Sequence, residues 1–293
     1  MFTAFVSHAQ QDAQFTQYMY NTININPAYA GSRGAMSIFA LHRTQWVGID
    51  GAPVTNAVSI NTPINNSRLG VGLSFVNDRI GPTTENEISA DVSYTIPVGA
   101  TTKLSFGVKG TANLFDFDNS RLNAVDKTDV SLQGVNQFNP NVGAGVYLHS
   151  DKAYVGLSVP NFLQSKNQYN DNEMAIYTEK MNFYLIAGYV FDLSPNLKFK
   201  PALLAKAVQG APLQADVSAN FMFFEKFVLG AAYRWDASVS AMAGFQITDG
   251  IYVGYAYDHE TTQLRNYSKG SHEAFLRFEL FNNVNKIISP RFF

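Results

Sequence analysis

Titratable side chains that could do chemistry are few in this sequence, and their spacing argues against a shared site. Asp258, His259 and Glu260 stand in a row, but adjacent residues of a strand point to opposite faces, so we expect a solvated rim loop there. None of the five histidines stands at metal-ligand spacing from another, and there is no cysteine for disulfides or thiolate metal sites. The sequence therefore predicts a protein that is not an enzyme and that has no cofactor and no metal.

Two glycine patterns resemble parts of known sites but lack the surrounding context. The stretch Gly156-Leu157-Ser158-Val159-Pro160 lacks the second glycine of a nucleophile elbow. Gly70 and Gly72 do not stand between a strand and a helix, which phosphate binding requires. We interpret these two glycines as small residues of a lumen or as points of close packing.

The composition narrows the class of protein further. With 293 residues and a formal net charge of −2, the chain has no strong positive field to favour nucleic acid. Charged residues make up only 15%, below the level usual in soluble domains, whereas Phe and Tyr are plentiful at 23 and 15. No stretch approaches the roughly 20 apolar residues of a spanning helix. A closed barrel is then the only structure with which the chain could cross a membrane.

The segment from Phe227 to Asp236 shows the pattern that predicts the fold. Alternate residues are apolar and end in Tyr233 and Trp235, whereas the residues between them are small and then charged. In an outer-membrane barrel such an apolar face contacts lipid, and aromatic residues collect where lipid meets water. The alternation recurs and predicts an all-β transmembrane barrel of about 14 antiparallel strands, near residues 36–47, 56–64, 68–78, 86–98, 102–117, 138–150, 152–162, 179–193, 196–209, 213–225, 226–236, 237–248, 250–260 and 272–282.

The lengths of the connections support a barrel independently. Every second connection is short, near residues 65–66, 99–100, 151, 194–195, 225–226 and 249–250. All the long ones fall between them, at residues 48–55, 79–85, 118–137, 163–178 and 261–271. Outer-membrane barrels have short periplasmic turns and longer extracellular loops, so this sorting also predicts which end of the barrel lies outside the cell.

The two ends of the chain are predicted to lie outside the strands. Residues 1–9 end in Ser7-His8-Ala9, which resembles a cleavage site, and they are interpreted as the remnant of a signal peptide. Residues 10–35 are expected to form a periplasmic segment or a plug in the barrel mouth. The barrel is expected over residues 36–282, followed by a periplasmic tail at 283–293.

Charged residues on the small and polar faces of the strands are predicted to line the lumen. They pair across the lumen or, alternatively, contact a plug, a solute or a polypeptide. The candidates are Lys109, Asp216, Arg234, Arg277 and Glu279, together with Asp91, Lys198, Lys200, Lys206 and Asp236.

Several motifs follow one another in an order that is specific for one family. They are Gln11-Asp12-Ala13-Gln14-Phe15, Asn26-Pro27-Ala28-Tyr29-Ala30-Gly31, Arg43-Thr44-Gln45-Trp46-Val47-Gly48, Gly270-Ser271-His272-Glu273 and Ser289-Pro290-Arg291-Phe292-Phe293. Through them the chain resembles the PorP/SprF outer-membrane proteins of the type IX secretion system, found in Bacteroidetes. The resemblance covers nearly the whole chain.

The resemblance implies a non-enzymatic barrel that serves secretion and gliding. Its partners would be a secreted, adhesin-type cargo with a C-terminal sorting domain, periplasmic anchoring or ring proteins, and outer-membrane lipid. In the long loops Phe138, Phe162 and Tyr169 are candidate anchors for the partner, because aromatic residues often dominate interfaces. The alternative is a passive outer-membrane channel or a transporter for hydrophobic solutes.

Overall fold

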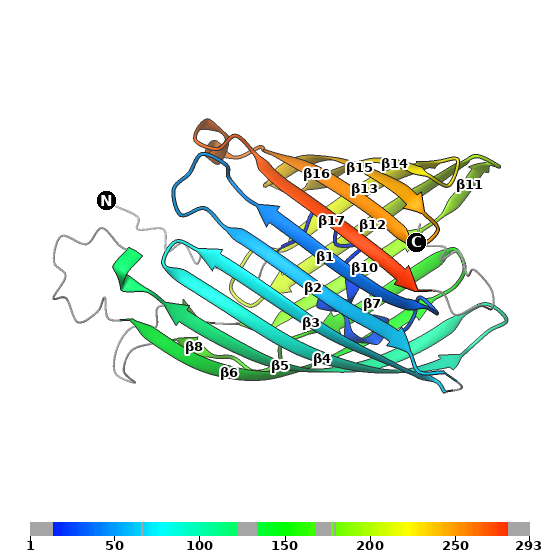
Figure 1. The fold of residues 1–293 in the computed structure, drawn as a ribbon, viewed down its shortest axis with the longest axis horizontal. Coiled ribbons are helices and arrows are strands. Elements are labelled where there is room, and N and C mark those ends of the chain that lie inside the picture. The colour runs from blue at the N-terminus through cyan, green and yellow to red at the C-terminus, as the bar shows by residue number, and fades with distance from the viewer. Residues whose placement is uncertain (1–13, 66, 122–133, 168–176, 179, 281–293) are drawn as a thin grey trace.

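The computed structural model describes residues 14–65, 67–121, 134–167, 177–178 and 180–280. The chain forms a closed antiparallel barrel of 14 strands, as the alternation predicts (Figure 1). β10 and β11 are two parts of one barrel strand, since both pair with β12 while β10 also pairs with β7. The first and last strands, β1 and β17, pair with each other and close the barrel.

The strand bounds agree closely with the predicted segments. The strands are β1 Met36–Thr44, β2 Val54–Pro63, β3 Leu69–Ile80, β4 Thr83–Pro97, β5 Lys103–Phe117, β6 Val135–His149, β7 Ala153–Val159, β10 Asn182–Tyr189, β11 Phe191–Ser194, β12 Leu197–Val208, β13 Gln214–Phe223, β14 Phe227–Arg234, β15 Ser238–Thr248, β16 Ile251–Glu260 and β17 Ser271–Leu280. A separate two-stranded ribbon, β8 Lys166–Asn167 with β9 Tyr177–Thr178, belongs to the connection between β7 and β10.

The described helices are short. They are α1 Thr22–Ile25, η1 Pro27–Tyr29, η2 Asn119–Arg121 and η4 Gln263–Asn266. None of the helices in the described part of the chain is long and apolar enough to cross a membrane.

The two faces of the strands have the predicted characters. On β14, Leu229 and Tyr233 are 55% and 48% exposed, whereas Val228 and Arg234 are 2% and 9% exposed. Large apolar side chains on most of the other strands are exposed in the same way, such as Leu73, Val108 and Leu157 at 58%, 61% and 58%. Because an apolar outer wall is stable only against lipid, the strands present the surface of an outer-membrane barrel.

The two ends of the barrel differ in their connections. At one end, here called the long-loop end, lie the connections 45–53, 118–134, 160–181 and 261–270. At the other, the short-turn end, the connections are no longer than residues 64–68 and 98–102. The prediction of a long loop at residues 79–85 is wrong, because β3 and β4 continue to a turn at Gly81 and Pro82. Their outer parts are polar, and cross-strand pairs such as Asn77 with Asn86 extend the hairpin.

Arginine on the outer face of β14 should impair assembly. Leu229→Arg is expected to destabilise the barrel by roughly 2–4 kcal/mol near the bilayer midplane. The matched control is Leu213→Arg, since Leu213 is 67% exposed in the connection before β13 and the cost near an interface is about 0–1 kcal/mol. Folding yield into lipid vesicles measures the difference, and equal yields would contradict the lipid-facing assignment of Leu229.

Ala256 would be a poor control for that experiment. It faces the lumen, but it is 0% exposed because the lumen is filled. Arginine at residue 256 would therefore overpack the interior and would also be destabilising.

Candidate functional site: a filled lumen

Residues 14–35, here called the lumen segment, lie inside the barrel (Figure 1). Nearly all of its side chains are buried, and Tyr18, Ile23 and Tyr29 are at most 4% exposed. They belong to one core cluster with inward residues of the wall. The inward faces of β1 and β2 are part of this core, with Phe39, Leu41 and Ala57 among its members. The interior is therefore a packed core built around an inserted piece of chain.

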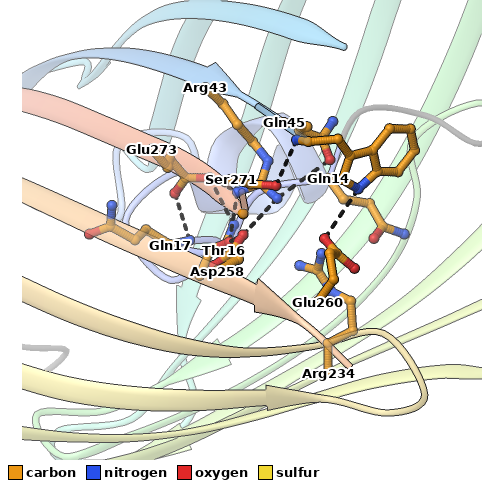
Figure 2. A network of polar contacts seen from close by, with 12 residues as sticks. Gln14, Thr16, Gln17, Arg43, Gln45, Arg234, Asp258, Glu260, Ser271 and Glu273 are labelled. Atoms are coloured by element: carbon orange, nitrogen blue, oxygen red, sulfur yellow. Dashed lines mark hydrogen bonds and ion pairs between the residues drawn. The ribbon is translucent and has the colours of Figure 1, made fainter. Parts of the chain in front are cut away.

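A cluster of buried charges, here called the clamp, holds the segment at the long-loop end (Figure 2). The clamp consists of Thr16, Gln17, Arg43, Asp258 and Glu273. The carboxylate of Glu273 accepts the backbone N–H groups of Thr16 and Gln17 at 2.9 and 2.8 Å. The Thr16 hydroxyl donates to Asp258 at 2.6 Å. Glu273 thus satisfies backbone donors that would otherwise be buried without partners.

Arg43 joins the two acids of the clamp. Its guanidinium lies 2.7 Å from Asp258 and 3.1 Å from Glu273, and it donates to the Thr16 hydroxyl at 2.8 Å. The three charged side chains are at most 2% exposed. Two carboxylates share one guanidinium, and Arg234 lies nearby in a bidentate pair with Asp216. Such a buried group is stable only while every charge keeps its partner.

Aromatic stacking continues the contact towards the middle of the lumen. The ring of Tyr20 lies 4.8 Å from that of Phe275 and 5.5 Å from that of Tyr252. The guanidinium of Arg277 lies 5.0 Å from the Tyr252 ring centroid, within range of a cation–π interaction. These rings pack the lumen segment against β16 and β17.

The motif Asn26 to Gly31 packs against a wall of glycines. The Asn26 side chain accepts from the Ala28 N–H and donates to the backbone carbonyls of Val146 and Leu157, at 3.0, 3.0 and 3.4 Å. A Cβ on Gly107 would lie 2.2 Å from Ala28 N, and a Cβ on Gly70 would lie 2.2 Å from the Ala30 carbonyl oxygen. Glycine is required at these positions because two backbones approach each other closely.

Side chains of the wall also bind the backbone of the lumen segment directly. Lys109 donates to the carbonyl of Asn24 at 3.1 Å, Ser158 to that of Ile25 at 2.9 Å, and Ser93 to that of Ala30 at 2.7 Å. These donors come from β5, β7 and β4. The segment is therefore held from several sides of the barrel.

Comparison with known proteins identifies the family. The family "Type IX secretion system membrane protein PorP/SprF" matches residues 7–278. The chain belongs to the PorP/SprF family. It is an outer-membrane protein of the type IX secretion system, in agreement with the barrel fold. No curated protein sequence matches the chain.

Solved structures similar to this PorP/SprF protein are outer-membrane barrels. The outer membrane protein Omp33 of Acinetobacter baumannii matches with a TM-score of 0.51 and 8% identity, over 84% of this chain and 98% of that chain. A FadL homologue of Pseudomonas aeruginosa has a TM-score of 0.47 and 12% identity, over 91% and 94% of the two chains. The KdgM porin has a TM-score of 0.40 and 9% identity, over 84% and 99%. At such identities the likeness extends to the fold alone.

The five main candidates for lumen charges in this PorP/SprF protein, Lys109, Asp216, Arg234, Arg277 and Glu279, all lie on the inner wall. Lys109 contacts the lumen segment and lies 3.8 Å from Asp91, and Asp216 pairs with Arg234. Arg277 and Glu279 lie 3.5 Å apart, and Glu279 also pairs with Arg33 of the lumen segment. Lys200 and Lys206 are buried as well. Lys198 lies at the rim, where it pairs with the exposed Glu225. The expectation for Asp236 is wrong, because it is exposed in the turn after β14 with a φ of 51°.

The candidate anchors fall in different environments. Phe138 belongs to β6 rather than to a loop and is 61% exposed on the outer face. Phe162 follows β7 and is 38% exposed. Tyr169 lies outside the described residues, as do the predicted signal remnant 1–9 and the predicted tail 283–293.

The prediction of a rim loop at residues 258–260 is wrong. β16 continues to Glu260, so Asp258 and Glu260 point inward together while His259 points outward. Residues two apart share a face of a strand, and this spacing could have marked the pair as one site. Within the described residues, no group of His, Cys, Asp or Glu is placed to hold a metal ion.

A methyl group on the glycine wall should disturb the fit of the lumen segment. Gly107→Ala is expected to destabilise the protein by about 1–3 kcal/mol, because the added carbon meets backbone. Gly110→Ala on the same strand is the control, since a Cβ there meets nothing within 4 Å. Samples heated to increasing temperatures are compared by gel electrophoresis. The temperature at which the band of the folded barrel is replaced by that of the unfolded chain measures the effect. Indistinguishable temperatures for the two variants would contradict the close packing.

Proposed function

We propose that this protein docks a secreted, adhesin-type cargo at the cell surface through the cargo's C-terminal sorting domain. In this proposal the barrel is not an enzyme, and its periplasmic side links to other components of the secretion machinery. Membership of the PorP/SprF family supports the setting. The nature of the lumen supports the choice of docking over transport.

The filled lumen is the observation that carries the proposal. The lumen segment occupies the space in which a channel would hold its solute, and wall residues bind its backbone along its length. A cavity beside Gln14, Tyr18 and Lys206 measures only about 20 Å³, which is room for about one water molecule. A hollow of about 290 Å³ lies beside Ala30 and Ser32 at the short-turn end, but the lumen segment occupies the space between the two ends, which supports the ends of the barrel as the working surfaces. The alternative of a passive channel or hydrophobic-solute transporter is disfavoured for the same reason.

A structured face at the long-loop end suits docking. Backbone hydrogen bonds tie the connection 45–53 to its neighbours. The Val47 N–H donates to the Gly270 carbonyl at 2.9 Å, and the Gly81 N–H donates to the Gly51 carbonyl at 2.8 Å. The Trp46 indole donates to Glu260 at 3.1 Å, and Trp46 adopts a φ of 47°. Such a left-handed conformation of a bulky residue is strained and persists only where surrounding contacts impose it. The loop is therefore held in one conformation, which suits the docking of a partner.

A hollow of about 410 Å³ lies in this face. It combines apolar residues such as Ile49 with the charged residues Asp50, Arg79 and Arg121. Arg121 lies 3.1 Å from Asp118, and hydrogen bonds from Ser120 lower the pKa of the Asp118 carboxyl. A mixed apolar and charged hollow fits a folded polypeptide better than a membrane or a nucleic acid.

The proposal is tested by isolating the tagged protein from its native outer membrane and identifying bound proteins. A secreted protein with a C-terminal sorting domain is expected to co-purify. Arg79→Asp, in the hollow, should reduce the amount recovered, whereas Asp151→Arg, in an exposed short turn, should not. Absence of any such cargo, or large open currents from the intact protein in planar bilayers, would refute docking.

A further inference from the structure

The lumen segment runs through the barrel in one direction. At the long-loop end, Gln14 exchanges amide hydrogen bonds with Gln214, the first residue of β13 after the connection 209–213. Gly31 lies against Pro63 and Gly70, which flank the short turn between β2 and β3. The chain therefore enters at the long-loop end, leaves at the short-turn end and continues into β1.

The contacts between these two ends fix the same direction. Thr16 donates to Asp258 near the end of β16, and Arg33 pairs with Glu279 near the end of β17. Between them, Lys109 donates to the carbonyl of Asn24 in the middle of the segment. β16 runs towards the long-loop end and β17 runs away from it. Successive residues of the segment thus lie progressively deeper in the lumen.

We propose that Gln14, the first described residue of the lumen segment, lies on the cell-surface side of the outer membrane. Long connections of outer-membrane barrels face the outside, and Gln14 lies at the end that carries them. Residues 10–35 are predicted as a periplasmic segment or a plug, and in this proposal only the part near residues 31–35 lies at the periplasmic end. Gln14 then lies at the same outward end as the connections 45–53 and 261–270.

This path has a consequence for assembly. The chain reaches the outer membrane from the periplasm, and the filled lumen leaves no room for later passage of its N-terminal end. The segment must therefore be in place before β1 pairs with β17. The clamp spans this seam, because Arg43 of β1 and Glu273 of β17 are direct cross-strand partners and both contact Thr16. Seam closure and capture of the segment are then one event.

Single cysteine variants test the proposal, since the chain has no cysteine of its own. Gln14→Cys reports on the N-terminal end, with Asp50→Cys as the long-loop reference and Asp151→Cys as the short-turn reference; both references replace exposed aspartates. A membrane-impermeant maleimide should label residues 14 and 50 on intact cells. It should label residue 151 only after the outer membrane is permeabilised.

Two labelling patterns would overturn the proposal. In the first, residue 14 reacts only after permeabilisation while residue 50 reacts on intact cells, which places the N-terminal end in the periplasm. In the second, residue 151 reacts on intact cells and residue 50 does not, which reverses the barrel and refutes surface docking through the long-loop end as well. If packing against Gln214 shields residue 14, a short epitope inserted before it and probed with antibody on intact cells gives the same decision.

A fusion experiment tests the location of the start of the lumen segment separately. A stably folded domain placed before Gln14 should abolish formation of the heat-resistant barrel, whereas the short epitope should be tolerated. A normally assembled barrel carrying the folded domain in the periplasm would overturn the proposal.

Discussion

Arg43→Met should be among the most destabilising single substitutions in the protein. It removes the guanidinium that lies within 3.1 Å of both Asp258 and Glu273 and leaves two carboxylates side by side with almost no access to water. Breaking a buried ion pair by removing one partner typically costs about 3–5 kcal/mol. Urea unfolding in detergent or lipid, followed by tryptophan fluorescence, measures the loss.

Arg121→Met provides the matched control for this prediction. Arg121 also pairs with an aspartate at 3.1 Å, but its side chain is 44% exposed, and exposed pairs contribute roughly 0–1 kcal/mol. Adding Glu273→Gln to Arg43→Met should recover part of the loss, since it removes one of the two unpaired charges. Equal stability of the two arginine variants would show that the clamp does not hold the structure together.

The sequence was sufficient to predict the barrel because its signal is local. Alternation with a period of two depends only on which face of a strand meets lipid, and Leu229 and Tyr233 on β14 carry that signal in full. The prediction was weaker where the lumen core is apolar. Phe39 and Leu41 of β1 point inward to the lumen segment, so both faces of that strand are partly apolar and the alternation fades.

The path of the lumen segment could not be predicted from the sequence. Residues 14–35 have no strand period, and their burial depends on a barrel that closes around them. The clamp joins Thr16, Arg43 and Glu273, which are separated by up to 257 residues, and no local pattern links them. The spacing of Asp258 and Glu260 was visible, but the bounds of β16 decided their meaning, and boundaries are what a sequence fixes least well.

Removal of the lumen segment should convert a silent barrel into a conducting one. A barrel of about 14 strands is wide enough to enclose a cavity, and in this protein residues 14–31 occupy that space. Deleting them, while keeping Ser32 to Ala35 as the link into β1, exposes a lumen lined by charged side chains such as Lys109, Asp216 and Arg277. In planar bilayers the intact protein is expected to show almost no current. The variant that lacks residues 14–31 is expected to show discrete channel openings.

The deletion variant must first be shown to retain its sheet. Circular dichroism and the different gel mobilities of unheated and heated samples provide that control. A peptide of residues 14–35 present while the shortened barrel refolds should then reduce the current, because the clamp and the glycine wall can still close around it. The same peptide with Asn26→Leu should act more weakly, since Asn26 bonds to the carbonyls of Val146 and Leu157. If the deleted barrel keeps its sheet and stays silent, something other than the lumen segment closes the lumen, and the argument for docking over transport loses its main support.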